Sequence, residues 1–271
     1  MARQIGEAVA HPSGIAESEP PLLICLLGTF RILKAGCPLA LTGGGKAKAL
    51  LGHLALHYRA GLPRDALLDL LWPGSEGTQA SQCLSSLLYS VHKLLGGALA
   101  DAAPVVHADD CYQLNGAAGV GVDVERFQAL VRAGERHAAA GDDAAAAVCY
   151  ERAAQLYRGD LCLGTDVQAV IEREHLRALY LTVLMRSAAH HYNRRDYAAC
   201  LAHALLVLRT DPYREDAHRL VMRCYVRRGE RAQALRQYRL CQDALRAEFD
   251  ATPEPATVAL FDRVRLAPDT V

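Results

Sequence analysis

The sequence has no long apolar run. Although 51% of its 271 residues are hydrophobic, no stretch approaches the roughly 20 consecutive apolar residues that a membrane-spanning helix needs. Residues 1–21 also lack the basic start and the apolar segment of a secretory signal peptide. We therefore expect a cytoplasmic chain without a membrane segment. At about 100–200 residues per domain, it is long enough for two domains with separate cores.

Paired cysteines are absent too. The nine cysteines are scattered singly, with no C-x-x-C pair and an odd total, which argues against both a zinc site and a disulfide framework. Most of them are expected to be small buried apolar residues. A redox-sensing cysteine is the open alternative, because thiol reactivity depends on local charge.

Motifs for catalysis or cofactor binding are missing. Gly43 to Gly45 precede Lys46, but a phosphate loop needs glycine where Ala40 stands and Ser or Thr where Ala47 stands. Neighbouring residues on a helix point about 100° apart, so the adjacent pair His190-His191 cannot easily share a metal. A cluster of Glu172, Glu174 and His175 is typical of a charged solvent face. We expect no cofactor, no metal, no catalytic residue and no enzymatic activity.

A surplus of basic charge is also lacking. The chain has 30 basic and 30 acidic side chains, whereas a nucleic-acid-binding chain often carries a basic surplus or a basic face. Residues 22–116 hold seven basic and six acidic side chains, a net charge of +1. Since non-specific affinity for DNA comes mostly from neutralised phosphates, any such affinity here depends on where a few residues lie.

The N-terminal part of the chain begins with residues that favour a tail and a small sheet. Residues 1–21 have little apolar periodicity, which predicts a disordered tail. Residues 22–33 are apolar and of strand length, and a turn at Lys34-Ala35-Gly36 leads back to residues 38–41. These residues predict a small antiparallel sheet.

Three helices and a hairpin are expected next. Leucines at helical spacing predict helices over 46–58, from Pro63 to Trp72, and over 78–95. Residues 105–107 and 112–114 are expected to form the closing hairpin, with Asp109-Asp110 at its turn. Sheet, three helices and hairpin together predict a winged helix over residues 22–116.

The third predicted helix is the candidate for contact with DNA. A three-helix core with a turn between its second and third helices can lay the third in the major groove. Its candidates for base or phosphate contact are Gln82, Ser85, Ser86, Tyr89, His92 and Lys93, and the candidates for phosphate contact elsewhere are Lys46, Lys48 and Arg64. Gln82 has the donor and acceptor that an adenine edge requires. The alternative for all of them is an ordinary solvated surface, and Asp109 and Asp110 would repel phosphate.

From Asp123 onward the sequence predicts paired helices. Asp123 is the expected cap of the first one, and breakers such as Gly141-Asp142, Asp211-Pro212 and Gly229-Glu230 divide the rest. A shift of 34 residues places Asp196 on Glu230, which is the tetratricopeptide period. We expect three irregular repeats that bind partners or pack on a neighbouring domain.

A family resemblance extends this interpretation. Residues 211–222, Gly229, Ala234-Leu235, Tyr238 and residues 245–249 resemble the bacterial transcriptional activator domain. Upstream, Leu27 to Ile32, Lys46 to Leu56, Asp65 to Trp72 and Tyr112 to Leu114 resemble the winged helix that precedes it in SARP-type regulators (Streptomyces antibiotic regulatory proteins).

The resemblance implies a mainly α protein in two parts: an OmpR-type winged helix over 22–116 and an all-α, tetratricopeptide-like activator domain over 123–266. It also implies binding to promoter DNA, often as paired copies, and activation through contacts with RNA polymerase. Homodimerisation and contact of the repeats with another protein are further expectations.

The sequence departs from the family in the third helix. Family members usually carry several arginines there, whereas this helix has Lys93 as its only fixed positive charge. A protein-interaction adaptor whose winged helix has lost its affinity for DNA is therefore the second hypothesis. A basic surface over Lys46, Lys48, Arg64 and Lys93 would favour the activator, and a neutral or acidic one the adaptor.

Overall fold

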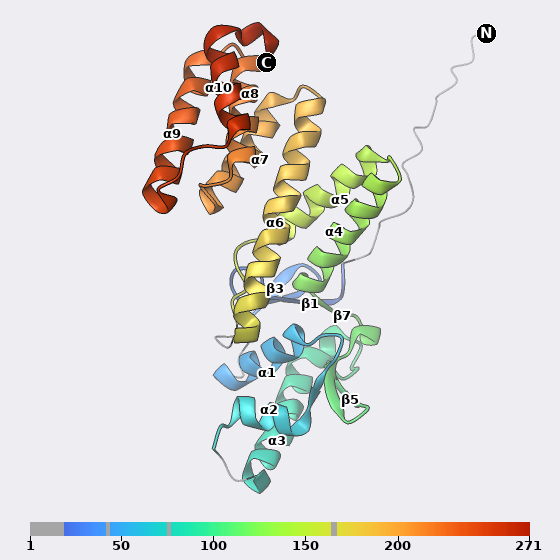
Figure 1. Cartoon of the computed structure of the whole chain (residues 1–271). Coiled ribbons are helices and arrows are strands. Elements are labelled where there is room, and N and C mark those ends of the chain that lie inside the picture. The colour runs from blue at the N-terminus through green and yellow to red at the C-terminus, as the bar shows by residue number, and fades with distance from the viewer. Residues whose placement is uncertain (1–18, 42–43, 75–76, 164–166) are drawn as a thin grey trace, which may run out of the picture.

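The computed structural model describes residues 19–41, 44–74, 77–163 and 167–271. A small sheet lies between two groups of helices, α1 to α3 on one side and the repeat helices on the other (Figure 1). The predicted tail, residues 1–21, falls outside the described residues except for its last three. Within the described residues, no helix combines the length and apolarity needed to cross a membrane.

The central sheet has two strands more than the sequence predicts. The segment 22–33, expected as one strand, forms two, β1 (Leu22–Cys25) and β2 (Arg31–Lys34), which continue as an antiparallel meander into β3 (Cys37–Leu39). Strand β7 (Val120–Val122) pairs in parallel with β1, so the order is β3-β2-β1-β7. A period-two pattern cannot reveal a strand of three residues, so the sequence does not predict β7. It lies just after the predicted winged-helix segment, whose boundaries stay a prediction.

Three helices and a second sheet follow the meander, as expected. The helices are α1 (Gly44–Leu56), α2 (Arg64–Leu71) and α3 (Gly77–Leu95). Strands β5 (Val105–Ala108) and β6 (Cys111–Leu114) form the hairpin, and the short strand β4 (Leu62–Pro63) pairs with β6. Asp109 and Asp110, with φ of 49° and 59°, make the left-handed turn that a two-residue hairpin loop requires.

The remaining helices stack as antiparallel pairs. The pairs are α4 (Asp123–Ala139) with α5 (Asp143–Leu156), α6 (Val167–Asn193) with α7 (Tyr197–Thr210), and α8 (Glu215–Arg227) with α9 (Arg231–Phe249), and α10 (Pro255–Leu266) packs against α8 and α9. The three expected repeats are therefore present. The described residues also include the short 3₁₀ turns Gly96–Ala98, Gly116–Ala118 and Pro268–Thr270.

The turns between the two helices of each pair share one backbone conformation. Gly141, Arg195 and Gly229 each adopt a left-handed φ, of 78°, 63° and 77°, and the next residue stands at the N-cap of the second helix. Asp142 and Asp196 accept hydrogen bonds from the backbone N–H groups three residues on. These contacts satisfy donors that a helix start leaves free. The 34-residue shift from Asp196 to Glu230 is thus a structural equivalence.

Asp123 does not play the capping role expected of it. Val122 holds the N-cap position of α4, and Asp123 is the first helical residue. Its carboxylate accepts hydrogen bonds from the backbone N–H groups of Leu26 at 2.8 Å and Leu27 at 3.0 Å, as well as from Val124. Only 2% of Asp123 is exposed. It therefore fastens the end of β1 to the start of the helical repeats.

A second contact ties the same chain segment to the repeats. Gly28 donates its N–H to the carbonyl of Asp160, Cys162 donates to the carbonyl of Leu26, and Leu27 forms an antiparallel bridge with Leu161. A Cβ on Gly28 would lie 3.1 Å from the Arg158 carbonyl oxygen, and its φ is 98°. Glycine is thus required at position 28 for close backbone approach.

The hydrophobic core is continuous across the two halves. One buried cluster extends from Leu22 through the winged helix and α4 to α7, and ends at Ala217 in the first turn of α8. Two smaller clusters fill the C-terminal repeats, one around Cys200 and one around Tyr238. The expectation of separate cores is wrong, because the sheet buries apolar residues against both groups of helices.

Replacing Asp123 with alanine tests the fastening between sheet and repeats. Asp123→Ala leaves two long-range N–H donors buried without acceptors, which costs about 1–3 kcal/mol each. We expect the free energy of unfolding in urea to fall by about 2–5 kcal/mol. The matched control is Asp243→Ala, an exposed aspartate on α9, for which the expected change is under about 0.5 kcal/mol. Equal effects of the two substitutions would contradict the fastening role.

Candidate nucleic-acid interface

Helix α3 buries one face and exposes the other. Ala80, Leu84, Val91 and Leu95 are buried, each with less than 5% exposed. They anchor the helix in the core that it shares with α1 and α2. The amphipathic pattern of the sequence is therefore confirmed for this helix, and the opposite face is free to meet a partner.

Five of the six candidates on α3 form one exposed ridge. Gln82, Ser85, Ser86, Tyr89 and Lys93 lie on the solvent side of the helix, and spacings of three, four, seven and eleven residues place them on one stripe. Tyr89 is 69% exposed, which is unusual for a large aromatic side chain. The Ser85 hydroxyl bonds back to the carbonyl of Ser81 at 3.2 Å. The ridge offers hydroxyl, amide and one ammonium group.

His92 lies apart from this ridge. Its ring is half-buried and packs over Gly96, where an added Cβ would lie 3.5 Å from the ring. Its Nδ1 atom is buried and has no hydrogen-bond partner among the described residues. The ring is thus mostly part of the packing at the end of α3. Contact between His92 and DNA stays a prediction.

The three basic candidates outside α3 lie on other elements and make contacts of their own. Lys46 donates a hydrogen bond to the carbonyl of Leu71 and lies 5.6 Å from the centre of the Trp72 ring. Lys48 lies 5.5 Å from the ring of Phe30, beside the central sheet. Arg64 is exposed at the start of α2, next to the strand that pairs with the hairpin. Contact between these three residues and phosphate stays a prediction.

The charge around α3 is correspondingly thin. Arg59 forms an ion pair with Glu125 of α4 at 2.8 Å, so its positive charge is neutralised where the winged helix meets the repeats. The tip of the hairpin carries the exposed carboxylates of Asp109 and Asp110. Chemically, the interface is suited to hydrogen bonding with base edges more than to neutralising many phosphates.

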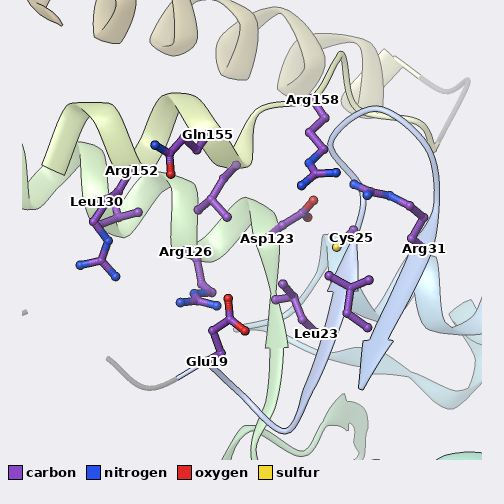
Figure 2. A pocket seen from close by; sticks show the side chains of 12 residues that line it. Glu19, Leu23, Cys25, Arg31, Asp123, Arg126, Leu130, Arg152, Gln155 and Arg158 are labelled. Atoms are coloured by element: carbon purple, nitrogen blue, oxygen red, sulfur yellow. The ribbon is translucent and has the colours of Figure 1, made fainter. Parts of the chain in front are cut away.

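A pocket of about 230 Å³ lies where the sheet meets α4 and α5. Arg31, Arg126, Arg152 and Arg158 line it together with Glu19 and Asp123. Figure 2 shows Arg31 and Arg158 extending toward each other beside Asp123. Burial raises the pKa of the Asp123 carboxyl, and its three backbone N–H donors and Arg31 offset part of this rise. The four arginines come from separate segments of the sequence, so no sequence motif predicts that they lie together.

The comparisons with known proteins agree with this architecture. The family model of the bacterial transcriptional activator domain matches residues 122–265, which is over half of the chain. The chain therefore belongs to the family of proteins that contain this domain. Its N-terminal half has the winged-helix fold that the resemblance to SARP-type regulators implies. The fold class expected from the sequence is confirmed.

Three relatives illustrate the similarity. Regulatory protein AfsR of Streptomyces coelicolor is 26% identical over 92% of this chain and 24% of its own length. Transcriptional regulatory protein EmbR of Mycobacterium bovis is 26% identical over 93% of the chain and 65% of its own length. The solved structure of Mycobacterium tuberculosis EmbR in complex with a low-affinity phosphopeptide has a TM-score of 0.72 at 24% identity, covering 91% of this chain and 65% of that one. The chain thus spans less than two thirds of the length of each.

Substitutions on the two faces of α3 are expected to differ in their effect on stability. Leu84→Ala removes a side chain that is 1% exposed and should lower the free energy of unfolding by about 2–5 kcal/mol. Tyr89→Ala removes one that is largely in solvent and should change it by less than about 0.5 kcal/mol. Urea unfolding monitored by circular dichroism measures both. A large loss of stability in Tyr89→Ala would mean that the ring packs against the protein and is not available to a partner.

Proposed function

We propose that this chain is a transcriptional activator that binds promoter DNA through α3. The observation that carries the proposal is the exposed ridge of Gln82, Ser85, Ser86, Tyr89 and Lys93 on the third helix of a winged helix. In that fold the third helix is the element that enters the major groove. Such a protein acts in the bacterial cytoplasm and needs no catalytic residue or cofactor for this role.

Within the ridge, each group has a distinct role in the proposal. The Gln82 amide pairs with an adenine edge, the serine hydroxyls and Tyr89 contact bases or phosphates, and Lys93 neutralises one phosphate. Lys46 and Arg64 are exposed and add phosphate contacts at the flanks. Lys48 lies beside the sheet and His92 is half-buried, so they contribute less.

The helical repeats supply the second half of the activity. With few phosphate contacts per chain, one copy binds DNA weakly, and a second copy on an adjacent half-site raises the affinity through effective concentration. We propose that α4 to α10 provide the contact with a second copy and with RNA polymerase or another protein.

The adaptor hypothesis rests on a specific observation as well. Lys93 is the single fixed positive charge on the ridge, and the hairpin tip is acidic. In an adaptor the same ridge, with Tyr89 at its centre, would meet a protein, since tyrosine is enriched where proteins bind each other.

Binding to DNA decides between the two hypotheses. DNA from the region upstream of the protein's own gene and a scrambled control are titrated by fluorescence anisotropy at several salt concentrations. We expect selective binding that weakens with salt. Lys93→Ala should weaken binding to both DNAs and reduce the salt slope by about 1, whereas Gln82→Ala should reduce the preference for the specific site by about 1–3 kcal/mol.

A matched control comes from β2. Lys34→Ala removes an exposed positive charge that lies outside α3 and outside α4 to α10, and it should not alter binding. No binding by the folded protein at low salt, to this DNA or to sites selected from a random pool, would reject the activator and leave the adaptor.

A further inference from the structure

Three helices bring two histidines and a carboxylate together away from the proposed DNA interface. Glu151 lies on α5, His191 near the end of α6 and His203 on α7. The Nε2 atoms of His191 and His203 are 3.3 Å and 3.2 Å from the same atom, Oε1 of Glu151. The three groups converge on one small volume.

The hydrogen bond of Nδ1 in His203 shows which ring nitrogen carries the hydrogen and which one presents its lone pair to Glu151. Nδ1 of His203 is 2.9 Å from the carbonyl oxygen of Ala199. A carbonyl only accepts hydrogen bonds, so Nδ1 carries the hydrogen and, in the neutral ring, Nε2 presents its lone pair to Glu151. In His191, Nε2 lies 3.3 Å from Oε1 of Glu151, and Nδ1 lies 3.8 Å from Oδ2 of Asp196, an ion-pair distance longer than a hydrogen bond.

The three groups face one another closely enough to bind one cation together. Protonating both rings would place two imidazolium ions in a stack whose centroids are 5.3 Å apart, with one carboxylate between them. A single metal ion satisfies all three donors. Metal-binding histidines commonly donate their other N–H to a backbone carbonyl or a carboxylate, as His203 does to the carbonyl of Ala199.

The spacing also fits a tetrahedral ion. Zinc binds imidazole nitrogen and carboxylate oxygen at about 2.0–2.2 Å, and tetrahedral ligands at that radius lie about 3.3–3.6 Å from one another. The observed oxygen-to-nitrogen distances are 3.3 Å and 3.2 Å. Imidazole ligands favour zinc over magnesium and calcium, which prefer oxygen alone.

We propose that Glu151, His191 and His203 form a binding site for Zn²⁺, with water as the fourth ligand. The side chains are 36%, 24% and 19% exposed, so the ion has access from solvent and room for a water. The bound ion joins α5 of the first helix pair to both helices of the second pair. It therefore holds the first two repeats in a fixed relation, in the part of the molecule that we propose contacts proteins.

The sequence does not predict this site. His190-His191 is the conspicuous pair, but those rings are 5.8 Å apart at an interplanar angle of 80°. The partner of His191 is His203, twelve residues on and in the next helix. A spacing this long, with the carboxylate 40 residues upstream, matches no local metal-binding pattern.

Cobalt(II) and zinc titrations of the metal-free chain test the proposal. We expect one Co²⁺ per chain, with visible absorption of a tetrahedral site that Zn²⁺ displaces, and no sulfur-to-metal charge transfer, which separates this site from the nine cysteines. Zinc at a hundredfold excess over its Kd should raise Tm by about 5 °C. His190→Gln, which alters the neighbouring histidine, should bind like the original chain.

The substitutions Glu151→Gln and His203→Gln should each weaken zinc binding at least about tenfold. Should a variant not fold, protection from diethyl pyrocarbonate in the unaltered chain gives the answer, since zinc should shield His191 and His203 and leave His190 reactive. Absence of stoichiometric binding, binding that persists in both variants, or equal reactivity of the three histidines with and without zinc would overturn the site.

Discussion

The structure depends on one buried carboxylate. The side chain of Asp123, in the first turn of α4, accepts hydrogen bonds from the backbone N–H groups of Leu26 and Leu27. These two residues directly follow β1. A carboxylate taken out of water is costly unless its oxygens accept hydrogen bonds, and these donors would be equally costly if left alone. The two needs are met only when sheet and repeats are in contact. The pairing of residues 26–28 with residues 160–162 then extends that contact along the backbone.

Patterns in the sequence were sufficient for the parts that depend on local forces. Leucine spacing located the three helices of the winged helix to within two residues at each end. The left-handed turns at Gly141, Arg195 and Gly229 explain why the repeats could be recognised. Features formed by residues that are far apart in the sequence could not be predicted from it. The partners of Asp123, the strand β7 and the single continuous core all depend on tertiary contacts across about a hundred residues.

The candidate site shows the same division. Helical periodicity was enough to place Gln82, Ser85, Ser86, Tyr89 and Lys93 on one exposed face. It could not show that Lys48 lies over Phe30, or that Arg59 is paired with Glu125 in another part of the chain. The positions of long basic side chains are set by what they meet in three dimensions, so the electrostatic character of the surface was the least predictable property.

A core that runs unbroken from Leu22 to Ala217 has a consequence for genetics. Because its apolar side chains lose their packing together, a damaging substitution in a repeat helix reduces the folded population of the winged helix as well. In a screen for loss of the protein's function, alleles would therefore map to the winged helix and to the repeat helices alike. Mapping alone would not distinguish residues that touch a partner from residues that keep the chain folded, and the amount of folded protein would have to be measured for every allele.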